Sequence, residues 1–164
     1  MRHSFQLIVS LLCLFGLCSC DGTSFQNPVP VYPVHVVVDT RGLFVHFMET
    51  NQNAYITVDK NGYFENDVFV KSSDVTDAWG YGGVVVYVSM LGYVAYDLAC
   101  PYCAGQSRKS PCYMDGIYAV CPHCGEQYEL GSGYALPQKG ISKYALRQLN
   151  IIQSDGKLTI TQRQ

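Results

Sequence analysis

The sequence is poor in charged residues, and its basic residues form no stripe. Only 15% of its 164 residues are Asp, Glu, Lys or Arg, and the formal net charge is −2. Nucleic-acid binding requires clustered Lys and Arg, often interleaved with aromatic side chains. The chain also lacks a Ser-His-Asp set, a close carboxylate pair and a phosphate-cradling glycine loop. We therefore predict no nucleic-acid partner and find no machinery for catalysis.

A sustained helical stripe is also absent from the chain beyond its first twenty residues. Short runs rich in Val and Tyr take its place, as is typical of strands. The ranges expected to form strands are 34–38, 44–48, 55–58, 63–64, 68–70, 84–90, 93–96, 117–120 and 157–161. These runs predict an all-β, antiparallel sandwich or small barrel.

Three dipeptides indicate hairpins between these runs. Asn61-Gly62 and Asp155-Gly156 are typical of tight turns in which both central residues adopt positive φ. Leu91-Gly92 is a third candidate, and residues 141–148 are expected to hold a short helical turn.

The first nineteen residues have the features of a targeting segment. Arg2 and His3 precede an apolar run that extends from Phe5 to Leu17, too short to span a bilayer stably. The run ends in a Leu-Cys-Ser-Cys sequence that resembles a lipobox, with Cys20 as the residue that receives the lipid. An ordinary cleaved signal peptide or a short membrane anchor are the alternatives.

These features predict a division of the chain into three parts. Residues 1–19 are interpreted as a lipoprotein signal peptide, residues 20–33 as a lipidated, proline-containing tether, and residues 34–164 as one β-domain. We therefore expect an exported protein of the cell envelope, held at the membrane by lipid on Cys20. The sequence identifies no envelope protein or redox partner.

Five of the eight cysteines lie between Cys100 and Cys124, as two Cys-x-x-Cys pairs and the single Cys112. A disulfide framework would distribute its cysteines along the chain, whereas two close pairs can converge on one metal centre. Each pair follows an expected strand. We therefore predict Cys100, Cys103, Cys121 and Cys124 as metal ligands. His123 lies within the second pair but is expected to point outward.

The sequence around these cysteines resembles the Rieske family. Tyr96-Asp97 precedes the first pair, and the second is followed by Gly125-x-x-Tyr128-x-Leu130 and later by Tyr144-x-Leu146-Arg147 and residues 155–160. The resemblance covers residues 80–161. It implies a Rieske-like β-fold that presents a metal centre on two loops, which in that family is a 2Fe-2S cluster.

Two departures from the family pattern concern the ligands. Cys124 stands at the second histidine position, and Cys103 stands near the first, with one additional residue. Glu126 occupies the position where many members have a serine. Because the histidine pair raises the potential of a Rieske cluster, we do not expect a high-potential centre.

The ligands and the export route favour zinc. Four cysteines suit a closed structural zinc site. The leader has no Arg-Arg pair, so we expect the chain to cross the membrane unfolded and to acquire zinc afterwards. The favoured function is a non-enzymatic structural or binding module. The alternatives are a 2Fe-2S electron carrier or two disulfides. Cys112 is the odd cysteine, for which a free thiol, a disulfide partner and a substitute ligand are the three alternatives.

Overall fold

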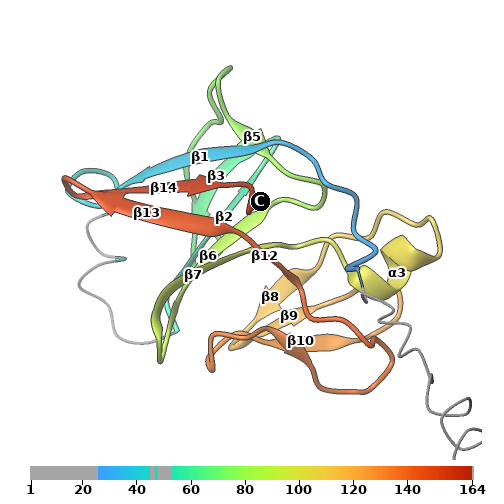
Figure 1. Cartoon of the computed structure of the whole chain (residues 1–164). Coiled ribbons are helices and arrows are strands. Elements are labelled where there is room, and N and C mark those ends of the chain that lie inside the picture. Colours follow the sequence, from blue (N-terminus) through green and yellow to red (C-terminus); the bar gives the residue numbers. More distant parts are fainter. Residues whose placement is uncertain (1–25, 45–46, 48–52, 164) are drawn as a thin grey trace, which may run out of the picture.

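The computed structural model describes residues 26–44, 47 and 53–163 (Figure 1). Within them the chain forms three antiparallel sheets and one short helix. This confirms the predicted all-β, antiparallel class. No helix among the described residues has the length and apolar character needed to cross a membrane.

The largest sheet has six strands in the order β12-β7-β6-β2-β3-β4. Its strands are β2 (Tyr55–Asp59), β3 (Gly62–Glu65), β4 (Val68–Lys71), β6 (Val84–Ser89), β7 (Gly92–Asp97) and β12 (Arg147–Gln148). β6 is apolar along nearly its whole length and is buried on both faces, as expected for a strand covered from both sides. It is therefore the natural centre of the molecule.

A four-stranded sheet covers one face of this large sheet. Its order is β13-β14-β1-β5, with strands β1 (Val34–Asp39), β5 (Ala78–Trp79), β13 (Asn150–Ser154) and β14 (Lys157–Thr161). In β1, Val34, Val36 and Val38 are buried, as the period of two in a strand requires. They pack with Ile56 and Ile160 in an apolar cluster that we call the upper core.

The third sheet lies below the other two in Figure 1 and is called the small sheet here. Its order is β11-β10-β9-β8, with strands β8 (Tyr113–Asp115), β9 (Tyr118–Val120), β10 (Gln127–Glu129) and β11 (Leu136–Pro137). The helix α3 (Pro101–Gly105) lies beside it in the figure. Tyr96 and Leu98 pack with Tyr128 and Leu130 in a second cluster, the lower core.

The predicted hairpins form, but two of their turns are displaced by one residue. Asp155 and Gly156 have φ of 48° and 70°, as the prediction requires. In the β2–β3 hairpin, Asp59 pairs with Gly62, so the turn residues are 60 and 61. The carboxylate of Asp59 holds that turn by accepting hydrogen bonds from the N–H groups at positions 61 and 62. The β6–β7 turn likewise lies at residues 90 and 91.

Two local expectations were wrong. Phe44 lies in a turn and Phe47 is helical, so neither is part of the expected strand, and residues 45, 46 and 48 lie outside the described residues. Residues 141–148 form no helical turn, because bends there lead directly into β12. The helix lies instead at Pro101–Gly105.

The expected signal peptide and Cys20 lie outside the described residues. The later part of the expected tether is described and contacts the β-domain. Val29 is 1% exposed, and the Asn27 side-chain amide donates to the Ala145 carbonyl at 2.9 Å. Arg147 donates through Nη2 to the carbonyls of Asn27 and Val29.

Candidate metal centre

The first cysteine pair is placed by the end of β7 and by helix α3. The Cys100 N–H donates to the Ser110 carbonyl at 3.0 Å, which fixes the chain just before the helix. Pro101 occupies the first helical position, where its fixed φ suits a helix and its missing N–H costs nothing. Residues three apart on a helical turn share a face. Cys100 and Cys103 can therefore present their sulfurs to one point.

The second pair lies in the turn between β9 and β10. The Gly125 N–H donates to the Cys121 carbonyl, and the Cys121 N–H donates to the Glu126 carbonyl, both at 2.9 Å. Gly125 has a φ of 74°, which L side chains rarely adopt. The glycine thus lets the chain reverse immediately after Cys124.

The structure brings the four predicted ligands together. Their Sγ atoms all lie within 4.8 Å of one another, an arrangement that could hold a metal ion. Cys100 Sγ lies 3.7 Å from Cys124 Sγ, and Cys103 Sγ lies 3.6 Å from Cys121 Sγ. A zinc–sulfur bond of about 2.3 Å gives tetrahedral sulfurs about 3.8 Å apart. The donor set and both of these sulfur–sulfur separations fit one tetrahedral ion.

Two of the four thiols have a lowered pKa, which favours the thiolate form. The pKa of Cys121 falls to about 3, first because Cys112 hydrogen-bonds to it and then through the N–H groups of Cys124 and His123 and the Ser110 hydroxyl. The Ser110 oxygen lies 3.3 Å from the Cys121 sulfur. The pKa of Cys100 falls to about 6, mainly through hydrogen bonds from Cys112 and Tyr128. Burial opposes both shifts.

The other two thiols are held in the protonated form. Burial raises the pKa of Cys103, and its hydrogen bond with Cys121 adds to the effect. Burial also raises the pKa of Cys124 to about 11. Four neighbouring thiolates repel one another without a cation, so metal binding at this group would release protons.

Cys112 lies beside the four-cysteine group but is not one of its members. It is buried, and its hydrogen bonds with Cys100 and Cys121 raise its pKa strongly. It is therefore a protonated neighbour of both ligand sulfurs, and its single S–H can donate to one of them at a time. All five cysteines are free in the structure, and His123 is exposed and outside the group.

Glu126 is a buried carboxylate that orders the backbone after the second pair. It is 0% exposed and accepts four backbone N–H bonds, from Gln127 at 3.0 Å, Lys139 at 2.8 Å, and Ile141 and Ser142 at 2.7 Å each. Burial alone would raise its pKa, but these four donors hold that pKa below its usual value. The carboxylate thus ties residues 139–142 to the second cysteine turn.

Asp97 has the same role ahead of the first pair. Its buried carboxylate accepts the N–H groups of Tyr81 at 2.7 Å, Gly82 at 2.8 Å and Ala99 at 2.8 Å. Burial raises the pKa of Asp97, against the effect of these donors and of the Arg147 charge. The sequence indicated neither of these carboxylate roles. The available signal was an acidic residue three positions before the first cysteine and two positions after the last.

No protein-family model and no curated protein matches the chain. Among solved structures, the chain is similar to one from the complex of reduced oxygenase and oxidized ferredoxin in carbazole 1,9a-dioxygenase. That likeness has 13% identity and a TM-score of 0.41, and it covers 70% of this chain and 86% of that one. The ferredoxin of Sphingomonas yanoikuyae B1 has 13% identity and a TM-score of 0.38, covering 69% of this chain and 100% of that one.

Likenesses at this level assign neither a family nor a cofactor, so the Rieske-like interpretation stays a prediction from the sequence motifs. Within the part of the chain that the structure describes, fold and site define its class: a nearly all-β protein with the short helix α3 and a four-cysteine group that could hold a metal ion.

Proposed function

We propose that this chain is a non-enzymatic metalloprotein in which Cys100, Cys103, Cys121 and Cys124 hold one zinc ion. The observation that carries the proposal is the mutual approach of the four sulfurs to within 4.8 Å. In a 2Fe-2S cluster the cysteines are divided between two irons, so sulfurs on opposite irons stand farther apart than those around a single ion. One tetrahedral ion therefore fits these positions better.

The chemistry that zinc supplies in such a site is structural. Zinc has no redox activity, and four protein ligands leave no open position for water or substrate. The ion would join helix α3 to the β9–β10 turn. The chain's own contribution is to bury three of the sulfurs and to supply hydrogen bonds from Cys112, Ser110 and backbone N–H groups.

We further propose that the protein is exported and anchored at the cell envelope by lipid on Cys20. The support is the apolar leader and the lipobox-like sequence that ends at this cysteine. The partner at the envelope is then the membrane itself. Cys20→Ala should release the protein from the membrane fraction, and unchanged membrane association would contradict lipidation.

A 2Fe-2S electron carrier of the envelope is the second candidate. It is favoured by Cys124, the one ligand of the group that is not fully buried. A cluster held by four thiolates would have the low potential of ferredoxin-type centres.

Metal analysis of the purified chain tests the two candidates directly. We expect a colourless protein with one zinc per chain. Brown protein with visible absorption and equal amounts of iron and sulfide would establish the electron carrier. Iron without sulfide would contradict zinc as the metal but would still agree with a single ion bound by the four cysteines.

A further inference from the structure

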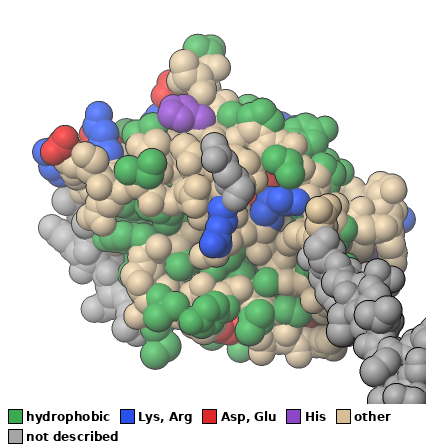
Figure 2. Space-filling model, viewed as in Figure 1, with side chains coloured by type: hydrophobic (Ala, Val, Ile, Leu, Met, Phe, Trp, Pro, Cys, Tyr) green, Lys and Arg blue, Asp and Glu red, His purple; other side chains and the backbone are tan. Residues whose placement is uncertain are grey.

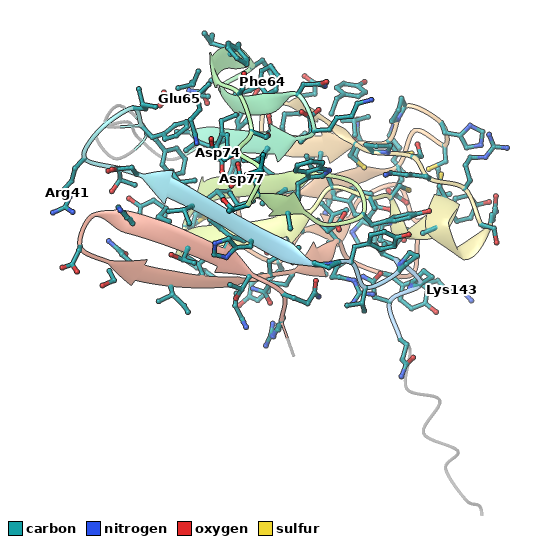
Figure 3. All side chains as sticks on the ribbon, turned by 90° about the horizontal axis from the view of Figure 1, so that it is seen from above. Arg41, Phe64, Glu65, Asp74, Asp77 and Lys143 are labelled. Carbon is teal, nitrogen blue, oxygen red and sulfur yellow. The ribbon has the colours of Figure 1, made fainter. Side chains whose placement is uncertain are left out.

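A second feature of the molecule is a surface pocket of about 560 Å³ at the end of the large sheet. It lies where the N-terminal segment, the loop before β12 and the C-terminal end of the chain meet. Its lining includes Asn27, Lys143, Arg147, Gln148, Gln162 and Arg163. In Figure 3, Lys143 lies beside the pale blue N-terminal segment.

The pocket has a pronounced charge imbalance. Lys143, Arg147 and Arg163 line it, and none of its described lining residues is Asp or Glu. Figure 2 shows Lys or Arg side chains near the middle of this face, close to the C-terminal end marked in Figure 1. Three cations gathered around one hollow in a chain of net charge −2 favour an anionic ligand.

Two side-chain nitrogens behind the wall of the pocket have no acceptor. Arg147 Nε and Gln162 Nε2 are buried, and neither has a hydrogen-bond partner among the described residues. Both are closed off from the pocket, so an anion in it would meet the remaining nitrogens of Arg147 and the side chains of Lys143 and Arg163.

The position of Arg147 is already fixed by other contacts. Its Nη2 donates to the carbonyls of Asn27 and Val29. Asp97 pairs with it across the strands, but the carboxylate of Asp97 already accepts three backbone N–H bonds. The guanidinium is thus held in place before a ligand arrives, which lowers the entropic cost of binding.

We infer that this pocket binds a phosphate group. Nη2 of Arg147 is occupied by two carbonyls and its Nε is buried, so the planar fork that can match phosphate oxygens is that of Arg163, which uses Nη1 for the Gln148 side chain. The charges of Lys143 and Arg147 beside it suit a group with more than one anionic oxygen. Both a soluble phosphate and the headgroup of an anionic phospholipid supply this chemistry.

Binding of a phospholipid headgroup rests on the proposed lipid anchor, which would bring the protein to the membrane. Binding of a soluble phosphate in the pocket does not. Asn27 follows Cys20 by seven positions. Seven residues span at most roughly 25 Å when extended. A lipid on Cys20 would therefore keep this pocket near the membrane surface.

Titration of the purified full chain with soluble probes tests the inference independently of the lipid anchor. The probes are inorganic phosphate and dihexanoyl-phosphatidylglycerol kept below its micelle concentration, followed by NMR shifts of the backbone amides of residues 143–148 and 162–163. The paired variant Lys143→Glu with Arg163→Glu is compared with Lys60→Glu, an exposed cation outside the pocket.

We expect saturable shifts and a loss of affinity of at least about tenfold in the paired variant, with Lys60→Glu unchanged. Binding of inorganic phosphate would support the inference with a soluble phosphate as the source. Binding of the short-chain lipid alone would support it with a headgroup as the source. Absence of binding by both probes, or equal losses in both variants, would overturn it. Zinc content is not involved in any of these readouts, so the metal proposal can fail separately.

Discussion

At the scale of single residues, the five cysteines of the domain differ in the expected effect of their replacement. Cys121 is in the four-sulfur group, whereas Cys112 only donates to it. Because metal binding and folding share one free energy in such sites, Cys121→Ser should lose the metal and more than about 3 kcal/mol of stability. Metal analysis and thermal unfolding measure both effects.

Cys112→Ser is the matched control, since serine can still donate a hydrogen bond from the same position. It should retain one metal per chain. Loss of metal from both variants would make Cys112 a ligand, and retention by both would remove Cys121 from the site.

Glu126→Gln tests the carboxylate that follows the second cysteine pair. Glutamine has one acceptor oxygen, so two of the four backbone donors would face an amide NH₂ instead. We expect a loss of about 2–4 kcal/mol in the free energy of unfolding. Glu129→Gln, which alters a carboxylate bonded to the single N–H of Ser132, should cost clearly less. Equal unfolding midpoints for the two variants in urea would refute the role given to Glu126.

The lowered pKa of Glu126 predicts how this contribution changes with pH. The folded state binds the proton of this group less tightly than the unfolded state, whose ordinary pKa is 4.5. The stabilisation is therefore complete above pH about 4.5 and is lost as the pH falls toward the lowered folded pKa. The difference in unfolding free energy between wild type and Glu126→Gln should narrow below that pH. If the difference in unfolding free energy between the two proteins instead widened in acid, the pKa of Glu126 would be raised by folding rather than lowered.

At the scale of elements, the β9–β10 turn depends on the conformation of one glycine. Gly125 and Gly140 have φ of 74° and 75°, and an added Cβ at either would meet no atom within 4 Å. Alanine at either position should cost about 1 kcal/mol of backbone strain. Only Gly125→Ala should also weaken metal retention, because Gly125 directly follows Cys124. Competition with a chromogenic chelator would measure this, and equal retention by both variants would contradict it.

The elements also show what the sequence could predict. Alternating valines indicated β1, and the continuous apolar run indicated β6, because burial on one or both faces leaves a local pattern. β10 (Gln127–Glu129) also alternates, with Tyr128 buried between two polar residues, but it spans only three residues directly after the second cysteine turn, which is too short a run to indicate a strand. Helix α3 is too short to produce a stripe.

In the candidate site, the cysteine ligands could be predicted from the sequence, but the carboxylates that order their loops could not. The spacing of the two cysteine pairs indicated that they converge, since each pair follows a strand. The roles of Glu126 and Asp97 depend on N–H groups at Ser142 and Gly82, sixteen and fifteen positions away. A backbone donor is present at almost every residue, so no residue type identifies these partners in advance.

At the scale of the whole molecule, the cysteines belong to one of two separate cores. Cys100, Cys103 and Cys121 are part of the lower core with Tyr128, whereas the upper core consists of valines, isoleucines and aromatic residues of the other sheets. Metal removal should therefore affect the molecule unevenly.

We expect a strong chelator to speed amide hydrogen exchange in β8, β9 and β10 by about tenfold or more while β1 and β14 remain protected. Hydrogen exchange followed by mass spectrometry would resolve the two regions. Uniform loss of protection would show that the two cores unfold as one unit.

The cross-strand pairing of Asp97 with Arg147 brings together the two ends of the segment that carries α3 and the small sheet. Residues 98–146 thus form an excursion that leaves and rejoins the large sheet at neighbouring points. The segment is nevertheless not separable from the sheet, because Tyr55, Tyr87 and Tyr96 of the large sheet pack in the same cluster as its cysteines. A short turn from position 97 to position 147 would leave these tyrosines uncovered. Any replacement for the segment would therefore have to cover the same face of the large sheet.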